Sequence, residues 1–119
     1  MPRQEDRTTS YERELLKGST DGLVLSVISD RPTYGYELIK ELERRSSGYF
    51  HFREGTLYPA LHRMEKDGLI EGRWQTLPGG QERRYYYITP RGTEALSRQR
   101  NTWSNFSAAV RSVLEAKAA

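Results

Sequence analysis

The chain has 119 residues, a length that favours one domain, with 35% hydrophobic and 29% charged residues. The formal net charge of +3 is a mild basic excess that is compatible with nucleic-acid binding. There is no cysteine, which excludes disulfides and thiolate metal sites, and no apolar run long enough to span a membrane. We therefore expect a cytoplasmic protein with a small core and with neither a metal nor a cofactor.

The first quarter of the chain predicts a tail followed by two helices. Residues 1–9 are polar and mixed in charge, and we expect a mobile tail there. A short helix is predicted over residues 10–17, and Gly18-Ser19 is expected to end it. Residues 22–29 are apolar on nearly every side, which fits either a central buried helix or a buried strand. The preceding Thr20-Asp21, as capping residues, favours a helix.

The next helix is predicted over residues 34–45, with Thr33 as its N-cap. Gly35 lies inside it and lowers helix propensity by up to about 1 kcal/mol relative to alanine. We interpret this glycine as a place where another helix backbone or DNA approaches closely. Residues 46–48, Ser-Ser-Gly, end the helix, and residues 49–52 form an aromatic connector that covers the core.

Residues 54–68 predict an amphipathic helix with two faces of different character. Apolar side chains recur at offsets of three and four on one face, where they can enter a core. The other face carries short side chains that donate hydrogen bonds, an aromatic ring and positively charged side chains. These groups suit the phosphates and base edges of a DNA major groove. Three basic and three acidic residues cancel over residues 53–67. We therefore expect Glu54 and Glu65 to face away from DNA, as partners of the helix dipole and of an internal salt bridge.

Two strands are predicted after this helix, over residues 69–75 and 83–89. The Pro-Gly-Gly sequence within residues 76–82 predicts the turn between them. The order of three helices and a β-hairpin is the connectivity of a winged helix-turn-helix. We predict a mainly α fold with a small β-hairpin, in which residues 10–89 form the DNA-binding domain and the helix over residues 54–68 is the recognition helix.

The last segment predicts one long helix from residue 90 to about residue 116. Thr89 as cap and Pro90 at the first helical position are a strong start signal. Apolar residues then recur with spacings of 7, 3, 4 and 3, the period of a helix that packs along another helix. A domain of about 70 residues cannot cover the apolar stripe along so long a helix. We therefore predict that residues 90–119 form a dimerisation helix that pairs with a second copy of the chain. The predicted dimer residues are Leu15, Leu96, Trp103, Phe106, Val110 and Val113.

Several short motifs, in this order along the chain, resemble the PadR family of transcriptional regulators. They are Leu16-Lys17-Gly18-Ser19, Tyr34-Gly35-Tyr36-Glu37, Glu54-Gly55-Thr56-Leu57-Tyr58-Pro59-Ala60-Leu61, Glu65-Lys66-Asp67-Gly68-Leu69-Ile70, Arg83-Arg84-Tyr85-Tyr86 and Thr89-Pro90-Arg91-Gly92. The resemblance covers about residues 15–93. It implies a dimeric winged-helix repressor that binds an inverted-repeat operator on double-stranded DNA at the bacterial nucleoid and is released by a small ligand or a stress signal.

The single C-terminal helix is similar to that of the small subgroup of this family. The resemblance implies that Trp103 lines a pore at the dimer interface and stacks on a flat aromatic effector, with Phe106 and Ser107 beside it. The predicted DNA-binding residues are Tyr36, Lys40, Gly55, Thr56, Tyr58, Pro59, His62, Arg63, Lys66, Gln81, Arg83 and Arg84.

An enzyme is not expected, because the chain has two histidines, no cysteine and no carboxylate pair in an apolar setting. The alternative that the residues leave open is a winged helix that binds a protein instead of specific DNA.

Overall fold

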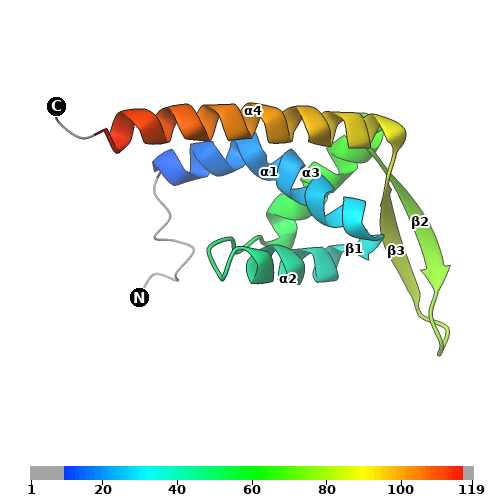
Figure 1. Cartoon of the computed structure of the whole chain (residues 1–119). Helices are drawn as coiled ribbons and strands as arrows, with labels where there is room; N and C mark the ends of the chain where they lie inside the picture. The colour runs from blue at the N-terminus through cyan, green and yellow to red at the C-terminus, as the bar shows by residue number, and fades with distance from the viewer. Residues whose placement is uncertain (1–9, 117–119) are drawn as a thin grey trace, which may run out of the picture.

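The computed structural model describes residues 10–116, so the tail predicted at residues 1–9 lies outside the described residues. In chain order the elements are α1 (Ser10–Asp30), β1 (Thr33–Tyr34), α2 (Gly35–Arg45), α3 (Glu54–Lys66), β2 (Ile70–Thr76), β3 (Glu82–Ile88) and α4 (Pro90–Leu114). Figure 1 shows α1 and α4 along one side of the molecule and α2 on the opposite side. The β2–β3 hairpin projects from the end where α4 begins. The predicted mainly helical winged helix-turn-helix fold is confirmed.

A single helix, α1, replaces the two helices predicted on either side of Gly18-Ser19. The hydroxyls of Ser19 and Thr20 donate to the carbonyls of Leu15 and Leu16, at 3.0 and 2.8 Å, and are thereby satisfied inside the helix. A glycine in a helix interior costs only about 1 kcal/mol, which burial of the second half of α1 outweighs. The predicted break was therefore wrong, whereas the helix over residues 22–29 is confirmed.

Thr33 lies in the short strand β1 and does not cap α2. Its side chain is 1% exposed and its hydroxyl donates to the Arg31 carbonyl at 2.8 Å. The residue before α2 is Tyr34, which makes no side-chain cap hydrogen bond. Strand β1 pairs antiparallel with β3, and the sheet order is β1-β3-β2. The two-stranded hairpin of the prediction is therefore one part of a three-stranded sheet.

The apolar face of α3 is buried as predicted. Leu57, Leu61 and Met64 are fully buried, and each buried side chain of this size stabilises the fold by about 1.5–3 kcal/mol. They belong to one core cluster with apolar side chains of α1, α2, β2 and α4, among them Leu25, Ile28, Leu38, Ile70 and Leu96. Leu96 is only 4% exposed in its own chain. It is therefore a core residue, which corrects its assignment to the dimer surface.

The hairpin pairs Ile70 with Ile88 at one end and Thr76 with Glu82 at the other, close to the predicted strands. We call this hairpin, residues 70–88, the wing. Its tip contains Gly79 and Gly80, whose φ angles of 101° and 89° are readily reached only by glycine. Helix α4 then begins as predicted, with Pro90 in its first turn and the Thr89 hydroxyl accepting a hydrogen bond from the Gly92 amide at 3.0 Å.

Candidate nucleic-acid interface

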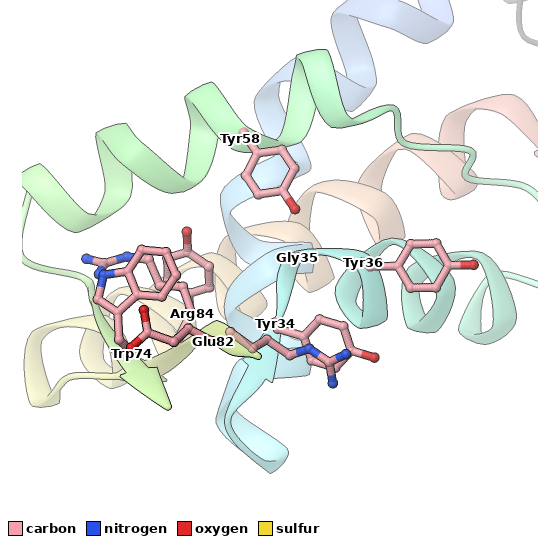
Figure 2. Close-up of a pocket in the computed structure, with 9 residues that line it drawn as sticks. Tyr34, Gly35, Tyr36, Tyr58, Trp74, Glu82 and Arg84 are labelled. Atoms are coloured by element: carbon pink, nitrogen blue, oxygen red, sulfur yellow. The ribbon is translucent and has the colours of Figure 1, made fainter. Parts of the chain in front are cut away.

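Two adjoining hollows, which share Tyr58, Arg84 and Tyr86, lie between α3 and the wing, and together we call them the α3–wing groove. Their lining comes from β1, from the start of α2, from one side of α3 and from both wing strands: Tyr34, Gly35, Tyr36, Tyr58, His62, Glu65, Lys66, Trp74, Glu82, Arg83, Arg84 and Tyr86. Figure 2 shows Tyr58 above this groove and Trp74, Glu82 and Arg84 on its wing side. The lining is rich in aromatic rings and carries three basic against two acidic side chains, a net charge of 3 − 2 = +1.

Tyr58 fixes the spacing between α2 and α3. Its ring lies against Gly35, where a Cβ atom would be 2.4 Å from the tyrosine hydroxyl oxygen and 2.7 Å from Cζ. Figure 2 shows the Tyr58 side chain directed toward Gly35. The close approach predicted at this glycine exists, but the approaching group is a side chain of α3, neither a backbone nor DNA. Tyr58 remains 41% exposed, so its other side faces the groove.

The outward face of α3 carries most of the predicted DNA-binding residues. Gly55, Thr56, Pro59, His62 and Lys66 are all exposed there. Because α3 buries only its opposite face, these side chains share one surface that can enter a groove of DNA. This surface borders the α3–wing groove through His62 and Lys66.

Helix α2 contributes Tyr36 and Lys40 at the edge of the same surface. Tyr36 is 53% exposed, so much of its ring is open to solvent. The Lys40 ammonium nitrogen lies 5.0 Å from the centre of the Tyr36 ring. Hydrogen bonding to the Tyr36 side chain raises the pKa of Lys40. The pair therefore presents a permanent positive charge next to an aromatic ring.

The arginines predicted to bind DNA have different partners in the protein. Arg63 donates to both carboxylate oxygens of Asp21 in α1, at 2.5 and 3.1 Å, and Arg84 donates to Glu65 of α3 at 2.5 Å. Arg83 lies on the other face of β3, with its guanidinium 3.9 Å from the centre of the Tyr34 ring. Arg83 and Arg84 thus point to opposite faces, as side chains alternate along a strand. The predicted role of Glu65 as an internal salt-bridge partner is confirmed.

Several groove residues were not among the predicted site residues. Tyr34 belongs to a two-residue strand, which is too short to show alternation along the sequence. Trp74 on β2 is 64% exposed and lines the groove. Tyr86 is 7% exposed, and burial raises the pKa of its hydroxyl. The alternation along β3 would have placed Tyr86 beside Arg84 on the inner face.

A second exposed surface lies along the later part of α4 and the start of α1. Trp103 and Phe106 are each 55% exposed, with their ring centres 6.4 Å apart. Val113 is 76% exposed, Leu15 is 42% exposed and Val110 is half-buried. The half-buried Ser107 donates to the Ser104 carbonyl at 3.3 Å. Trp103, Phe106, Val110 and Val113 fall on one side of α4 at helical spacing, with Ser107 beside them, and we call this surface the α4 stripe.

The family profile described as Transcriptional regulator PadR-like family matches residues 24–98. The chain belongs to this family. The PadR-like chain is 36% identical over 88 residues to the transcriptional regulator Rv3488 of Mycobacterium tuberculosis, across 74% of this chain and 78% of that protein. Its structure is similar to that of a PadR-like transcriptional regulator of Bacillus cereus, with a TM-score of 0.77, 36% identity and coverage of 87% and 99% of the two chains. A PadR family transcriptional regulator of Eggerthella lenta gives a TM-score of 0.78 at 31% identity, with coverage of 95% and 96%.

The PadR-like chain is thus a winged-helix transcriptional regulator and not an enzyme. Within residues 10–116, no cluster of histidine, aspartate and glutamate side chains could hold a metal ion. None of the described helices is long and apolar enough to cross a membrane.

Proposed function

We propose that this PadR-like protein is a homodimeric repressor that binds an inverted-repeat operator and is released by a small aromatic ligand. The observation that carries the proposal is the pairing of two surfaces on one fold. One is the α3–wing groove together with the outward face of α3, and the other is the α4 stripe. The first surface presents an exposed helix face with polar and basic side chains that can bind DNA. The second presents exposed apolar side chains that a second copy of the chain can cover.

The outward face of α3 enters the major groove, where Thr56, Tyr58, Pro59, His62 and Arg63 read base edges. Gly55 lets the DNA backbone approach, and Lys66 binds a phosphate near the end of the helix. Tyr36 and Lys40 contact the DNA backbone beside α3. Arg83 and Gln81 reach the neighbouring backbone or minor groove from the wing. Arg83 suits this role because stacking on a ring leaves the charge of its guanidinium unneutralised.

The α4 stripe supports the homodimer. In the described part of α4, the buried residues are Gly92, Ala95 and Leu96, all within its first two turns. The later turns of this helix of about 37 Å expose Trp103, Phe106 and Val113 to solvent in the single chain. A second chain covers these side chains and sets two recognition helices about one turn of DNA apart, roughly 34 Å.

The same stripe supports a ligand site at the dimer interface. Trp103 and Phe106 offer two ring faces tilted by 36°, and Ser107 offers a hydroxyl at their side. A flat aromatic ligand between the two copies of Trp103 stacks on these rings. Because the ligand contacts both chains, it changes the spacing of the two recognition helices and so releases the operator.

A gel shift with operator and random duplexes at physiological salt tests the proposal. The operator candidate is a promoter fragment that carries an inverted repeat, and the random duplex has the same length and composition. We expect the promoter fragment to bind at least about a thousandfold more tightly, as specific DNA-binding proteins do. Equal affinity for the two duplexes would instead favour the alternative, a winged helix that binds a protein.

A further inference from the structure

Glu65 of α3 binds both strands of the wing at once. Its Oε2 atom accepts a hydrogen bond from the Arg84 guanidinium of β3 at 2.5 Å and another from the Gly72 amide of β2 at 3.2 Å. Glu65 is on the recognition helix, 19 residues before Arg84 in the chain. A single carboxylate therefore joins the helix and the wing, the two elements that line opposite sides of the α3–wing groove.

The wing is built to hold the Arg84 guanidinium at this place. A Cβ atom on Gly72 would lie 2.4 Å from Arg84 Nε and 2.6 Å from Cζ, so the absence of a side chain there makes room for the guanidinium. The guanidinium carbon also lies 5.5 Å from the centre of the Trp74 ring. Figure 2 shows Arg84 and Trp74 adjacent on the wing side of the groove. Glycine, tryptophan and glutamate thus enclose one arginine head group.

Burial makes this ion pair different from the other ion pair of the wing. The Glu65 and Arg84 side chains are 29% and 30% exposed, whereas Glu71 and Arg73 form a pair at 3.2 Å in which both side chains are 56% exposed. Water screens the attraction between the charges of Glu71 and Arg73 strongly, and that between Glu65 and Arg84 less. The charge of Arg84 is consequently neutralised inside the protein, in contrast to that of Arg83, which stacks on a ring.

We propose that Arg84 and Glu65 are positioning residues that set the angle between the recognition helix and the wing, and that Arg84 does not contact DNA. This replaces the expectation that Arg84 binds DNA directly. The proposal rests on the proposed function, in which α3 and the wing bind neighbouring DNA surfaces together. Operator binding needs both elements at the right angle, whereas random DNA can be bound through phosphates in many arrangements.

The substitution Glu65→Gln distinguishes a DNA contact by Arg84 from a positioning role, because the two roles predict opposite changes in operator affinity. If Arg84 is a DNA contact, losing the carboxylate frees a cation and removes a negative charge beside DNA, so the operator binds more tightly. If Arg84 is a positioning residue, operator affinity falls by about tenfold, the size of one lost base-pair contact, while affinity for random duplex stays equal or rises. Fluorescence anisotropy with labelled operator and random duplexes gives both affinities.

Two further variants provide the controls. Glu71→Gln removes the same charge from the same wing without touching α3, and we expect its ratio of operator to random affinity to match the unmodified protein. Gly72→Ala displaces the Arg84 guanidinium without changing any charge, because only the end of a flexible side chain must move. We expect Gly72→Ala to lower operator affinity as Glu65→Gln does. If a thermal melt shows that the Glu65→Gln protein is not folded, the operator affinity of Gly72→Ala tests the positioning role in its place.

The salt dependence of binding gives an independent readout. If Arg84→Gln leaves the slope of log affinity against log salt unchanged, Arg84 makes no phosphate contact; a lost contact lowers the slope by about 0.9. A lower slope, or tighter operator binding by Glu65→Gln, overturns the positioning role. If the unmodified protein itself does not distinguish operator from random DNA, the proposed function fails instead.

Discussion

At the scale of the residue, Arg63 binds a carboxylate in the protein, and in the proposed complex it would instead bind a base on DNA. Its guanidinium binds Asp21 of α1 at 2.5 and 3.1 Å and lies 3.6 Å from Asp67. The Arg63 and Asp21 side chains are 52% and 23% exposed, so this pair stabilises the free protein by about 1 kcal/mol or less. A bidentate arginine–guanine contact contributes about 1–3 kcal/mol. The larger energy favours transfer of Arg63 from Asp21 to DNA.

We therefore predict opposite effects for two substitutions of this pair. Arg63→Ala should weaken operator binding by about 1–3 kcal/mol and leave dimerisation unchanged, because it removes a base contact. Asp21→Asn should strengthen operator binding, because the guanidinium no longer has to leave a carboxylate. Titrations with operator and random duplexes measure both effects.

Two results would contradict a base-reading role for Arg63. An equal loss of affinity on operator and random duplexes would show that Arg63 binds only phosphate. A lower melting temperature of both variants, with both DNA affinities unchanged, would show that Arg63 only holds α3 against α1.

The sequence predicted which residues of α3 face outward but not which protein groups bind them. A helical period of 3.6 residues places His62 and Lys66 opposite the buried face, and this needs only local information. Asp21, the α1 partner of Arg63, and Glu65, the partner of Arg84, lie 42 and 19 residues away in the chain. Such contacts depend on how α1, α3 and the wing pack together, which no local pattern encodes.

At the scale of the element, α2 is attached to the end of α1 by a small network of charges. Arg45 donates to Glu41 within α2 at 2.9 Å and to Asp30, the last residue of α1, at 2.6 Å. Arg44 binds the same Glu41 carboxylate. Hydrogen bonds from Arg44 and Arg45 lower the pKa of Glu41 from 4.5 to about 2. Glu41 is therefore charged in the folded protein at a pH at which it is protonated in the unfolded chain.

This shift predicts a pH-dependent contribution to stability. Because the folded pKa is the lower one, the contribution is fully present above pH 4.5 and is lost as the pH falls toward 2. Glu41→Gln should therefore lower the melting temperature at neutral pH and have little effect near pH 2. Thermal unfolding followed by circular dichroism across this range measures the difference.

Glu43→Gln is the matched control for this prediction. Glu43 is exposed on the same helix, lies 3.6 Å from the His51 imidazole and takes no part in the network around Glu41. We expect its melting temperature at neutral pH to equal that of the unmodified protein. If Glu41→Gln and Glu43→Gln behave alike at neutral pH, the network around Glu41 does not stabilise the joint between α1 and α2.

Local sequence patterns predicted α2, α3, the wing and α4, but they predicted a break within α1 and did not predict β1. Gly18-Ser19 is a helix breaker by propensity, yet tertiary packing of the apolar residues after it holds α1 together. Thr33 has the side chain of an N-cap, but pairing with Tyr86 in the sheet places it in a strand. In both cases a contact with a distant element outweighed a preference of about 1 kcal/mol.

At the scale of the whole molecule, α4 connects the DNA-binding body to the proposed second copy. Its first turns pack in the core through Ala95 and Leu96, and it runs antiparallel beside α1. The α4 stripe continues beyond this core, with Trp103 and Phe106 exposed in the single chain. In the proposed dimer, a helix shared between the core and the α4 stripe would transmit a change at that stripe to both recognition helices.

We predict that Phe106→Glu converts the dimer to a monomer without unfolding it. Phe106 is 55% exposed in the single chain, so the substitution spares the core but places a charge in an apolar interface. Operator affinity should fall by at least about a hundredfold, because two half-sites are no longer bound together. Ala108→Glu is the control, since Ala108 is exposed and lies about 200° around the helix from Phe106. Sedimentation and operator titration of both variants measure the effect; a Phe106→Glu protein that stays dimeric would place the dimer interface elsewhere.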